Sequence, residues 1–479
     1  MSHLLWSAFV AMALLLSGCA PNWGNAVMAT RNNPDTLEAS HALEGLGTGP
    51  WPEQSWWKAF GDPQLDQLMA EALTGAPTLR IAEARVGRAL AIAGVVDAVR
   101  SPQVNLEGTS IYQRFTEKGA VPPSFAGEKR SVNLLTLGLN YDIDLWGKNR
   151  SAYEAALGEV RVAEVESAAA RLQLTTAIAA TYIRLNYAFE QCDVEAAILK
   201  QQEQVAELTA KRVKAGIDSA VELHHSQGLT ASTKADIRAL EEQINLLRNQ
   251  LAALAGAGPD RCASITAPAL RDSRNLTLPT QLPSQLIGRR SDIVAQLWRI
   301  ESMSKRIEEA KAAFYPNVNL FAFAGFDSIG IENVLSSEGR VFGVGPAVTL
   351  PLFDGGRLRH NLGIREAEYD ENIERYNSLI VNAIREVADQ VVSWQGIKAQ
   401  QQEEQKAVAG FEAANRLAML RYRQGLADYL TVLATEEALL RERRREVALN
   451  AREFETSVAL TKALGGGYLP AIKPSESGH

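Results

Sequence analysis

The sequence predicts a mainly α-helical chain with a small β part that is internally duplicated. Residues 101–106 (SPQVNL) recur in similar form at 315–320 (YPNVNL), and residues 212–217 (RVKAGI) recur at 421–426 (RYRQGL). Each half also has two segments of alternating polarity, followed by a long stretch with the composition of a helix. A period of about 210 residues is far too long for a solenoid repeat, so we expect a tandem duplication with two similar halves.

The charge balance argues against nucleic acid as the main partner. The 479 residues include 49 basic and 56 acidic side chains, which gives a formal net charge of −7. A protein that binds nucleic acid needs a basic face. Partners of another kind are therefore expected.

The first 18 residues resemble a targeting signal. The apolar stretch 4–16 ends in small residues, as in a secretory signal peptide, and residues 16–19 (LSGC) resemble a bacterial lipobox. In such a signal Cys19 is acylated and becomes the first residue of the mature chain, and Ala20 after it resembles the sorting signal of outer-membrane lipoproteins. The usual positive residues before the apolar stretch are missing, so an uncleaved anchor with an incidental cysteine is the alternative.

The other two cysteines are expected to be free thiols. Cys192 lies on an apolar helix stripe, which indicates a buried thiol. Cys262 lies in a loop, far from Cys192 along the predicted helix axis. A disulfide between them stays open as an alternative, because the signal peptide indicates an oxidising compartment.

Short helices are predicted before the first alternating segment. Residues 20–50 lack periodicity and are expected to be a tether. Asp62-Pro63 starts a helix, because proline suits the first helical position. A second helix runs from about Pro77 to Val99, and Pro102 ends it.

Two strands are predicted in each half. Residues 104–112 and 135–144 alternate between apolar and polar side chains, and residues 318–326 and 342–352 repeat the pair. Such strands, apolar on one face only, suit half of a soluble sandwich, but their length also suits a tilted strand that crosses a membrane.

A helical hairpin follows each strand pair. Residues 150–214 contain no proline, and as one helix they would extend about 100 Å. Gly216 marks a turn, and the returning segment to Leu254 has the 3-4 apolar spacing of a coiled coil. The second half repeats this hairpin, with its turn at Gly425 and its end at Gly465.

The strand count then predicts an assembly of three chains. Four strands cannot close a membrane barrel, because the smallest closed barrels have about eight strands, and lipid does not tolerate open edges. Three chains would give a trimeric 12-strand barrel, closed by rotational symmetry. Two long periplasmic helical hairpins per chain would place a 12-helix tunnel below it.

Short motifs spread over almost the whole mature chain connect it to a known family. They are residues 56–57 (WW) with 62–65 (DPQL), 289–293 (RRSDI), 314–316 (FYP), 350–357 (LPLFDGGR) and 421–425 (RYRQG). In these motifs the chain resembles the TolC-type outer-membrane channels of tripartite efflux and secretion systems. It is most similar to the lipoprotein branch that includes the OprM-like and NodT-like proteins.

The resemblance implies a function, partners and a location. It implies a homotrimer in the outer membrane, anchored to lipid through Cys19, with a large periplasmic part and a girdle of mixed structure at its middle. The chain would be a passive exit channel for small toxic molecules. An inner-membrane pump of the resistance-nodulation-division or major-facilitator type would deliver them through a periplasmic adapter protein.

The resemblance also implies which residues control the periplasmic end. The tips of the hairpins fall at Gly216 and Asp218 and at Gly425 and Asp428. The glycines allow a tight reversal, and each aspartate can cap the returning helix. Capping is the structural alternative to a functional role for these aspartates.

A gate is expected just after the second tip. Leu430 falls where relatives have an apolar ring. Relatives have an aspartate four residues later, where this chain has Ala434. Glu436 or Glu437 is therefore the candidate for the acidic part of the gate.

No catalytic motif, metal site or cofactor site is recognisable in the sequence, so the chain is not expected to be an enzyme or to bind a cofactor. The histidine pair His224-His225 is expected to be solvated. A second function stays open, which is a lipid-tethered periplasmic coiled-coil scaffold without a pore.

These expectations divide the chain into nine segments. They are a signal peptide (1–18), a lipid-anchored tether (19–55), equatorial helices (56–101), a barrel hairpin (102–146), a periplasmic helical hairpin (147–256), an equatorial linker and helix (257–315), a second barrel hairpin (316–353), a second helical hairpin (354–464) and a tail (465–479).

Overall fold

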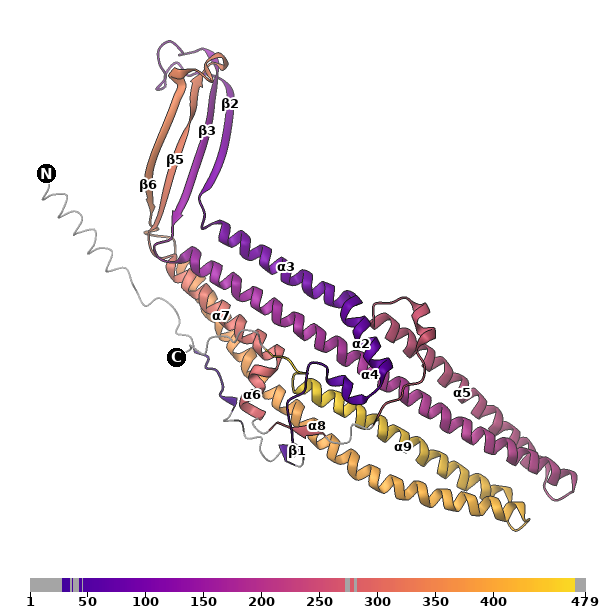
Figure 1. Cartoon of the computed structure of the whole chain (residues 1–479). Coiled ribbons are helices and arrows are strands. Elements are labelled where there is room, and N and C mark those ends of the chain that lie inside the picture. The colour runs from indigo at the N-terminus through magenta and orange to yellow at the C-terminus, as the bar shows by residue number, and fades with distance from the viewer. Residues whose placement is uncertain are drawn as a thin grey trace.

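The computed structural model describes residues 28–34, 37, 43–44, 46–271, 276–279 and 282–469. Over these ranges the chain is a long body of helices with a four-stranded sheet at one end (Figure 1). The signal peptide, Cys19 and the end of the predicted tail lie outside the described residues. No helix within the described ranges has both the length and the apolar character that a membrane span requires.

The order of elements confirms the predicted fold class and its duplication. In chain order they are β1 (Gly47–Thr48), α2 (Pro63–Gly75), α3 (Pro77–Ala98), β2 (Gln103–Arg114), β3 (Lys129–Ile143), α4 (Lys148–Lys214), α5 (Ala220–Leu254), β4 (Thr277–Leu278), α6 (Leu282–Arg289), α7 (Ser291–Ala312), β5 (Asn317–Ile329), β6 (Arg340–Thr349), α8 (Arg357–Arg423) and α9 (Tyr429–Ala463). Both halves have a 67-residue helix followed by a 35-residue helix.

The four long strands form one antiparallel sheet in the order β2-β3-β5-β6. The two hairpins join through β3 and β5, where Leu135 pairs with Phe326 and Tyr141 pairs with Leu320. β2 and β6 are therefore the outer strands, and neither has a second partner strand in the described chain. Apolar side chains on these strands, such as Leu106 and Phe342, are largely exposed. The sheet thus has open edges and apolar surface that remain to be covered.

Both long helices begin with the same turn after a strand. Before α4, Gly147 has a φ of 72°, and the Asp144 carboxylate accepts two hydrogen bonds from backbone N–H groups at the helix start, at 3.1 and 2.8 Å. Before α8, Gly356 has a φ of 90°, and the Asp354 carboxylate accepts two such bonds at 3.0 and 2.9 Å. Both turns thus reverse the chain and supply the N–H groups of a helix start with an acceptor, with the aspartate four residues before α4 and three residues before α8.

Each long helix is covered by two shorter helices placed one after the other. α3 and then α5 lie along α4, and α7 and then α9 lie along α8 (Figure 1). The two halves join because α7 and α9 also contact α4. At 1.5 Å per residue, a 67-residue helix extends about 100 Å. The helices therefore form an elongated wall, and α4 is packed from both sides.

The largest apolar core lies at the middle of this wall. There α2 and the short 3-10 helix Trp56–Phe60 pack against α4, and the three aromatic side chains of the 3-10 helix are buried. The Asp62 carboxylate is buried in the same region. It accepts a hydrogen bond of 2.7 Å from the Tyr182 hydroxyl and one of 2.7 Å from the backbone N–H of Ala269. The tryptophan and DPQL motifs thus hold the short helices against α4.

The N-terminal segment 28–34 lies along α8. The backbone N–H of Ala29 donates to the Asp370 carboxylate at 3.1 Å, and the backbone N–H of Asn32 donates to the Asn377 side-chain oxygen at 2.8 Å. The predicted tether is therefore bound to the helical body over these residues.

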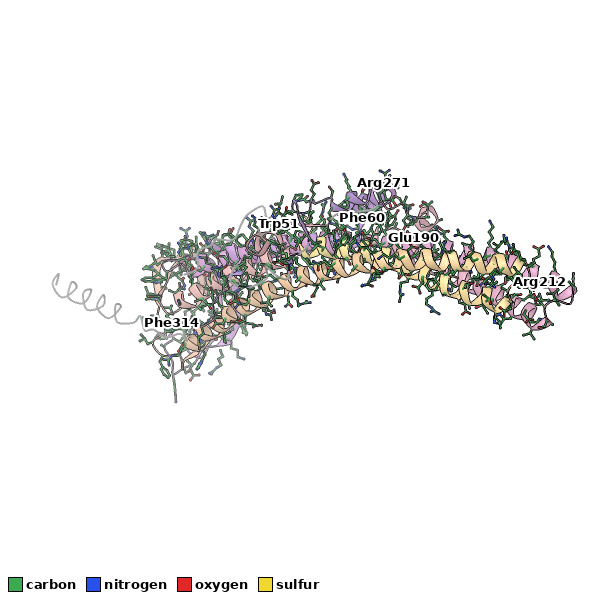
Figure 2. All side chains as sticks on the ribbon, turned by 90° about the horizontal axis from the view of Figure 1, so that it is seen from below. Trp51, Phe60, Glu190, Arg212, Arg271 and Phe314 are labelled. Atoms are coloured by element: carbon green, nitrogen blue, oxygen red, sulfur yellow. The ribbon has the colours of Figure 1, made fainter. Side chains whose placement is uncertain are left out.

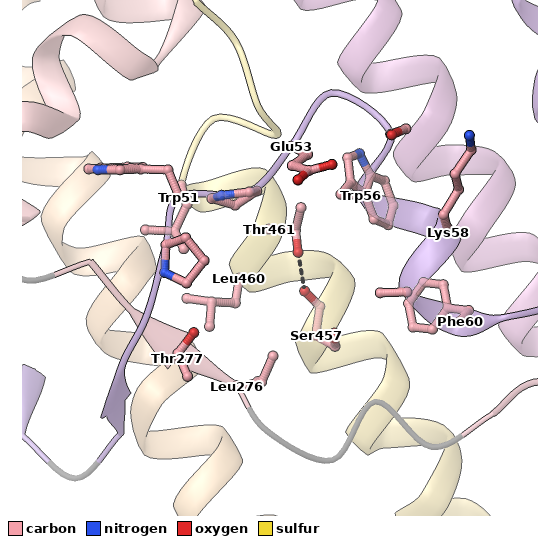
Figure 3. Close-up of a pocket in the computed structure, with 15 residues that line it drawn as sticks. Trp51, Glu53, Trp56, Lys58, Phe60, Leu276, Thr277, Ser457, Leu460 and Thr461 are labelled. Carbon is pink, nitrogen blue, oxygen red and sulfur yellow. Dashed lines mark hydrogen bonds between the residues drawn. The ribbon is translucent and has the colours of Figure 1, made fainter.

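A pocket of about 500 Å³ opens where residues 50–60 cross the middle of the wall (Figure 3). Trp51 and Trp56 line it from this stretch, Leu276 from the chain before β4, and Leu460 from α9. Parallel pairing of β1 with β4 holds this crossing in place. Leu460 is near the end of α9 that lies opposite the hairpin tip, so the pocket is remote from the tips.

The two cysteines in the described ranges are free thiols, and both are half-buried. Burial raises the pKa of the Cys192 thiol. The expected free thiols are confirmed, and the disulfide alternative is wrong.

Candidate functional site at the hairpin tips

Both hairpins reverse through the same glycine turn. Gly216 has a φ of 71°, and the backbone N–H of Ile217 donates to the Arg212 carbonyl at 2.9 Å. Gly425 has a φ of 73°, and the backbone N–H of Leu426 donates to the Arg421 carbonyl in the same way at 2.8 Å. A left-handed residue followed by this bond satisfies the last carbonyls of a helix. The structure therefore places both predicted tip glycines at the turns. Both allow the tight reversal that was predicted for them.

The two tip aspartates have different roles. Asp428 caps α9, because its carboxylate accepts a hydrogen bond of 2.9 Å from the backbone N–H of Thr431. Asp218 does not cap α5, and the expectation that it would is wrong. Ser219 is the capping residue, paired with Glu222 in a capping box. The Asp218 side chain turns away because a nearby guanidinium binds it.

Asp218 belongs to a group of four residues that joins the two hairpins, which we call the tip cluster. Its members are Thr209, Arg212, Asp218 and Tyr422. Arg212 binds Asp218 with both ends of its guanidinium, at 2.8 and 3.0 Å. Tyr422, on the second hairpin, donates from its hydroxyl to the Asp218 carboxylate at 2.8 Å, and Thr209 lies 2.9 Å from the same hydroxyl. Arg212 lies at the far end of the body in Figure 2.

The tip cluster is well shielded from water. Tyr422 has no exposed surface, and the side chains of Arg212 and Asp218 are only 13% and 10% exposed. The guanidinium also lies over the Tyr422 ring, 4.6 Å from its centre. The hydrogen bonds from Arg212 hold the pKa of the Asp218 carboxyl below its usual range, and burial raises the pKa of Tyr422. The ion pair is therefore intact throughout the neutral range.

A small apolar cluster supports these polar contacts. Val205 of α4 packs with Tyr422, Tyr429 and Val432 of the second hairpin. His225 of α5 contacts the edge of the Tyr429 ring, with the ring centres 5.9 Å apart. The expected exposure of His224 and His225 is found, and His225 has this aromatic partner in addition.

The three gate candidates differ in exposure. Leu430 is 65% exposed, and Glu437 is exposed as well. Glu436 is only 7% exposed, because it faces α4 instead of solvent. Ala434 is exposed and brings no carboxylate to this surface. Of the two acidic candidates, only Glu437 therefore presents a free surface in the single chain.

Glu436 is part of a second contact zone, which we call the polar layer. Its members are Gln201 and Gln202 of α4, Thr233 of α5, Asn415 of α8, and Thr435 and Glu436 of α9. Gln201 donates to Asn415 at 3.1 Å, and Thr233 donates to Gln202 at 2.9 Å. Both glutamine amides also face the Glu436 carboxyl group and lower its pKa. The layer connects all four long hairpin helices just above the apolar cluster.

The sequence contained a signal for the tip cluster that pattern reading missed. When the duplicated tips are aligned, Val213 of the first half matches Tyr422, and Asp218 matches Ala427 of the second half. The cross-hairpin hydrogen bond joins two of the positions at which the halves differ. Other positions of the tips, such as Ala215 and Gln424, differ as well, so the difference alone would not have identified the contact.

The comparisons with known proteins agree over the length of the chain. The family model described as outer membrane efflux protein matches residues 68–257 and 282–466. The multidrug resistance outer membrane protein MdtP of Escherichia coli K12 is 31% identical over 481 residues, which cover 98% of this chain and 97% of that protein. The fusaric acid resistance protein FusA of Burkholderia cepacia is 34% identical over 364 residues, which cover 75% of this chain and 69% of that protein.

Solved structures show the same fold. The outer membrane protein VceC of Vibrio cholerae has a TM-score of 0.80 at 38% identity, covering 87% of this chain and all of that one. The Campylobacter jejuni CmeC outer membrane channel has a TM-score of 0.83 at 20% identity, covering 93% of this chain and 97% of that one. The second likeness shows the fold alone.

Proposed function

We infer that this chain, which belongs to the outer membrane efflux protein family, is the outer-membrane exit channel of a tripartite efflux system. The match to an efflux family over both halves is the observation that carries the conclusion. The elongated wall of helices below one sheet fits such a channel, because it provides a long periplasmic part and a short membrane part. This function needs no catalytic residue.

The sheet supports assembly as a homotrimer. β2 and β6 are open edges, and their apolar side chains are exposed in the single chain. Three copies joined β6 to β2 would pair every edge, which lipid requires. The hairpins of the three copies would then enclose a tunnel whose periplasmic end is formed by the tips.

The efflux system supplies the partners. A periplasmic adapter would dock on the hairpin tips, and an inner-membrane pump of the resistance-nodulation-division or major-facilitator type would provide the energy. The relatives are named for resistance to multiple drugs and to fusaric acid. We therefore propose small toxic organic molecules as cargo.

The position of the N-terminal segment supports the lipid anchor at Cys19. Met28 donates its backbone N–H to Asp370, which is 13 positions after the start of α8 and thus about 20 Å below the strand ends. The chain from Cys19 to Met28 can span at most about 30 Å. An acylated Cys19 can therefore reach the level of the strand ends while the segment stays bound to α8.

Two measurements test the function. Purified protein in a planar lipid bilayer is expected to be a trimer that conducts ions, and deletion of the gene is expected to sensitise cells to a panel of toxic compounds. A scaffold without a pore would give no current in the bilayer. Unchanged sensitivity to every compound of a broad panel would count against export.

A further inference from the structure

The polar layer is unusual because it interrupts the apolar contact between the hairpins with a buried carboxylate. Glu436 is 7% exposed, and its Oε1 atom has no hydrogen-bond partner. No ion pair of Glu436 occurs in the part of the chain that the structure describes. A buried and incompletely bonded carboxylate is costly in its charged form, so this position favours the neutral acid.

The groups that face Glu436 do not supply a positive charge. α4 presents the amides of Gln201 and Gln202, and α5 presents the Thr233 hydroxyl through Gln202. On α9 the nearby titratable groups are Glu437 and Tyr429, whose ionised forms are both negative. From α8 the layer receives only the Asn415 amide.

No cation is among the groups that shift the pKa of Glu436. The positive side chains beside the layer, Lys200 of α4 and Arg416 of α8, are exposed and line its open outer side. Neither forms an ion pair with Glu436 in the described chain. Its charge is therefore opposed by burial and by Glu437, and the two glutamine amides compensate only in part.

We propose that the polar layer is a proton-dependent switch, in which neutral Glu436 keeps the two hairpins together and ionised Glu436 favours their separation. This inference rests on the proposed function, because it concerns the periplasmic end of the tunnel. The layer lies next to the tip cluster, so separation at Glu436 would loosen the contacts that hold the tips. Glu436 acts here as a positioning residue and does not contact cargo.

The direction of the pH effect follows from linkage. Burial raises the pKa of Glu436 in the closed arrangement above its ordinary value of 4.5. In an open arrangement the carboxyl meets water and returns toward that value. The closed arrangement is therefore fully favoured below about pH 4.5 and loses this advantage as the pH rises toward the raised pKa. Because the closed arrangement binds one more proton in that window, the closed-to-open ratio of a chain falls by up to about tenfold per pH unit as the pH rises.

The test is single-channel recording of the purified full chain between pH 4.5 and 8. The open probability of the unmodified protein is expected to rise with pH. Glu436→Gln keeps the size of the side chain and an oxygen that accepts from the amides, but it cannot ionise. It is expected to abolish the component of the pH response that begins above pH 4.5 and to hold the open probability at the low-pH level.

A matched control and a second variant complete the test. Glu207→Gln makes the same chemical change on α4, where Glu207 is 69% exposed and paired with Lys211, and it is expected to leave the pH response unchanged. Gln202→Ala removes an amide that stabilises the carboxylate, so the midpoint of the response should move to higher pH.

The outcomes separate this inference from the proposed function. A pH response that Glu436→Gln leaves intact, or an unmodified channel whose opening does not vary with pH, would overturn the switch. A purified trimer that carries no current at any pH would instead contradict the channel itself.

Discussion

The hydroxyl of Tyr422 is bonded to two residues of the other hairpin, which makes it the most direct connection between the tips. Asp218 accepts from it at 2.8 Å, and Thr209 lies 2.9 Å away. Arg212 holds Asp218 in position without help from Tyr422. Removal of the hydroxyl therefore weakens the link between hairpins and leaves the ion pair of the first hairpin in place.

Tyr422→Phe is expected to loosen the tips. Loss of these hydrogen bonds should weaken the contact by about 1 kcal/mol, because Asp218 keeps its bonds to Arg212. The channel should open more often in bilayer recordings at neutral pH. Tyr187→Phe is the control, because the Tyr187 hydroxyl bonds only to Gln191 of its own helix among the described contacts. An unchanged open probability in Tyr422→Phe would show that the tip cluster does not restrain opening.

The proposed lipid anchor at Cys19 predicts that Cys19→Ala carries no lipid. Labelled palmitate supplied to cells should be incorporated into the unmodified protein and not into this variant, because the alanine has no sulfur to acylate. Cys262→Ala serves as the control, since Cys262 lies in the body of the folded chain. Equal labelling of Cys19→Ala and the unmodified protein would show that the anchor lies elsewhere.

The long helices derive their stability from the elements that cover them and from the turns at their ends. The turns at Gly216 and Gly425 need a left-handed backbone, which side chains with a Cβ adopt at a cost. Gly410 is also in a hairpin helix, but it has helical geometry and open space around it. The same substitution should therefore have opposite effects at a turn and within a helix.

Gly425→Ala should destabilise the second hairpin by about 1 kcal/mol, because alanine is strained at a φ of 73°. Gly410→Ala should stabilise it by about 0.5–1 kcal/mol, because alanine restricts the unfolded chain and meets no neighbour within 4 Å. Thermal unfolding followed by circular dichroism would measure both shifts. A Gly425→Ala protein as stable as the unmodified one would contradict the role assigned to the turn.

At the scale of the whole molecule, the single chain is incomplete at its sheet. Among the described residues, the two outer strands are each paired on one side only, and the apolar side chains on one face need lipid or a neighbour. Leu137 is on that face, beside Leu106 and Ala324, whereas Thr136 points to the other face. The two neighbouring positions therefore distinguish a lipid-facing surface from an interior one.

Leu137→Arg is expected to reduce the yield of assembled trimer in the outer membrane, since a charge on the lipid face of a strand costs about 2–4 kcal/mol near the membrane centre. Thr136→Arg, one position away, should be tolerated because its side chain faces the water-filled interior. Heat-modifiable trimer on denaturing gels measures the yield. Equal loss in both variants would argue that the sheet does not have one face in lipid.

The sequence predicted the elements better than it predicted contacts between them. Strands and long helices follow from local periodicity, and they lie close to where alternation and proline placed them. The cap at Ser219 and the ion pair of Asp218 lie within the first hairpin, but they are side-chain hydrogen bonds that periodicity does not encode. The bond from Tyr422 to Asp218 and the burial of Glu436 depend on contact between the two hairpins. Residues 28–34 also follow no repeating pattern. Their backbone N–H groups bind amide and carboxylate side chains of α8.

The helices that cover α4 and α8 change at the middle of the wall, from α3 and α7 to α5 and α9, and this change has a mechanical consequence. Below that level each long helix is covered by its return helix, and α9 also contacts α4. The body bends along its length (Figure 2). A 35-residue arm is about 50 Å long, so a rotation of 10° about the middle would displace its tip by about 9 Å. The wide core around Tyr182 can thus act as a hinge region. A small repacking of this core would change the width of the periplasmic opening by a much larger distance.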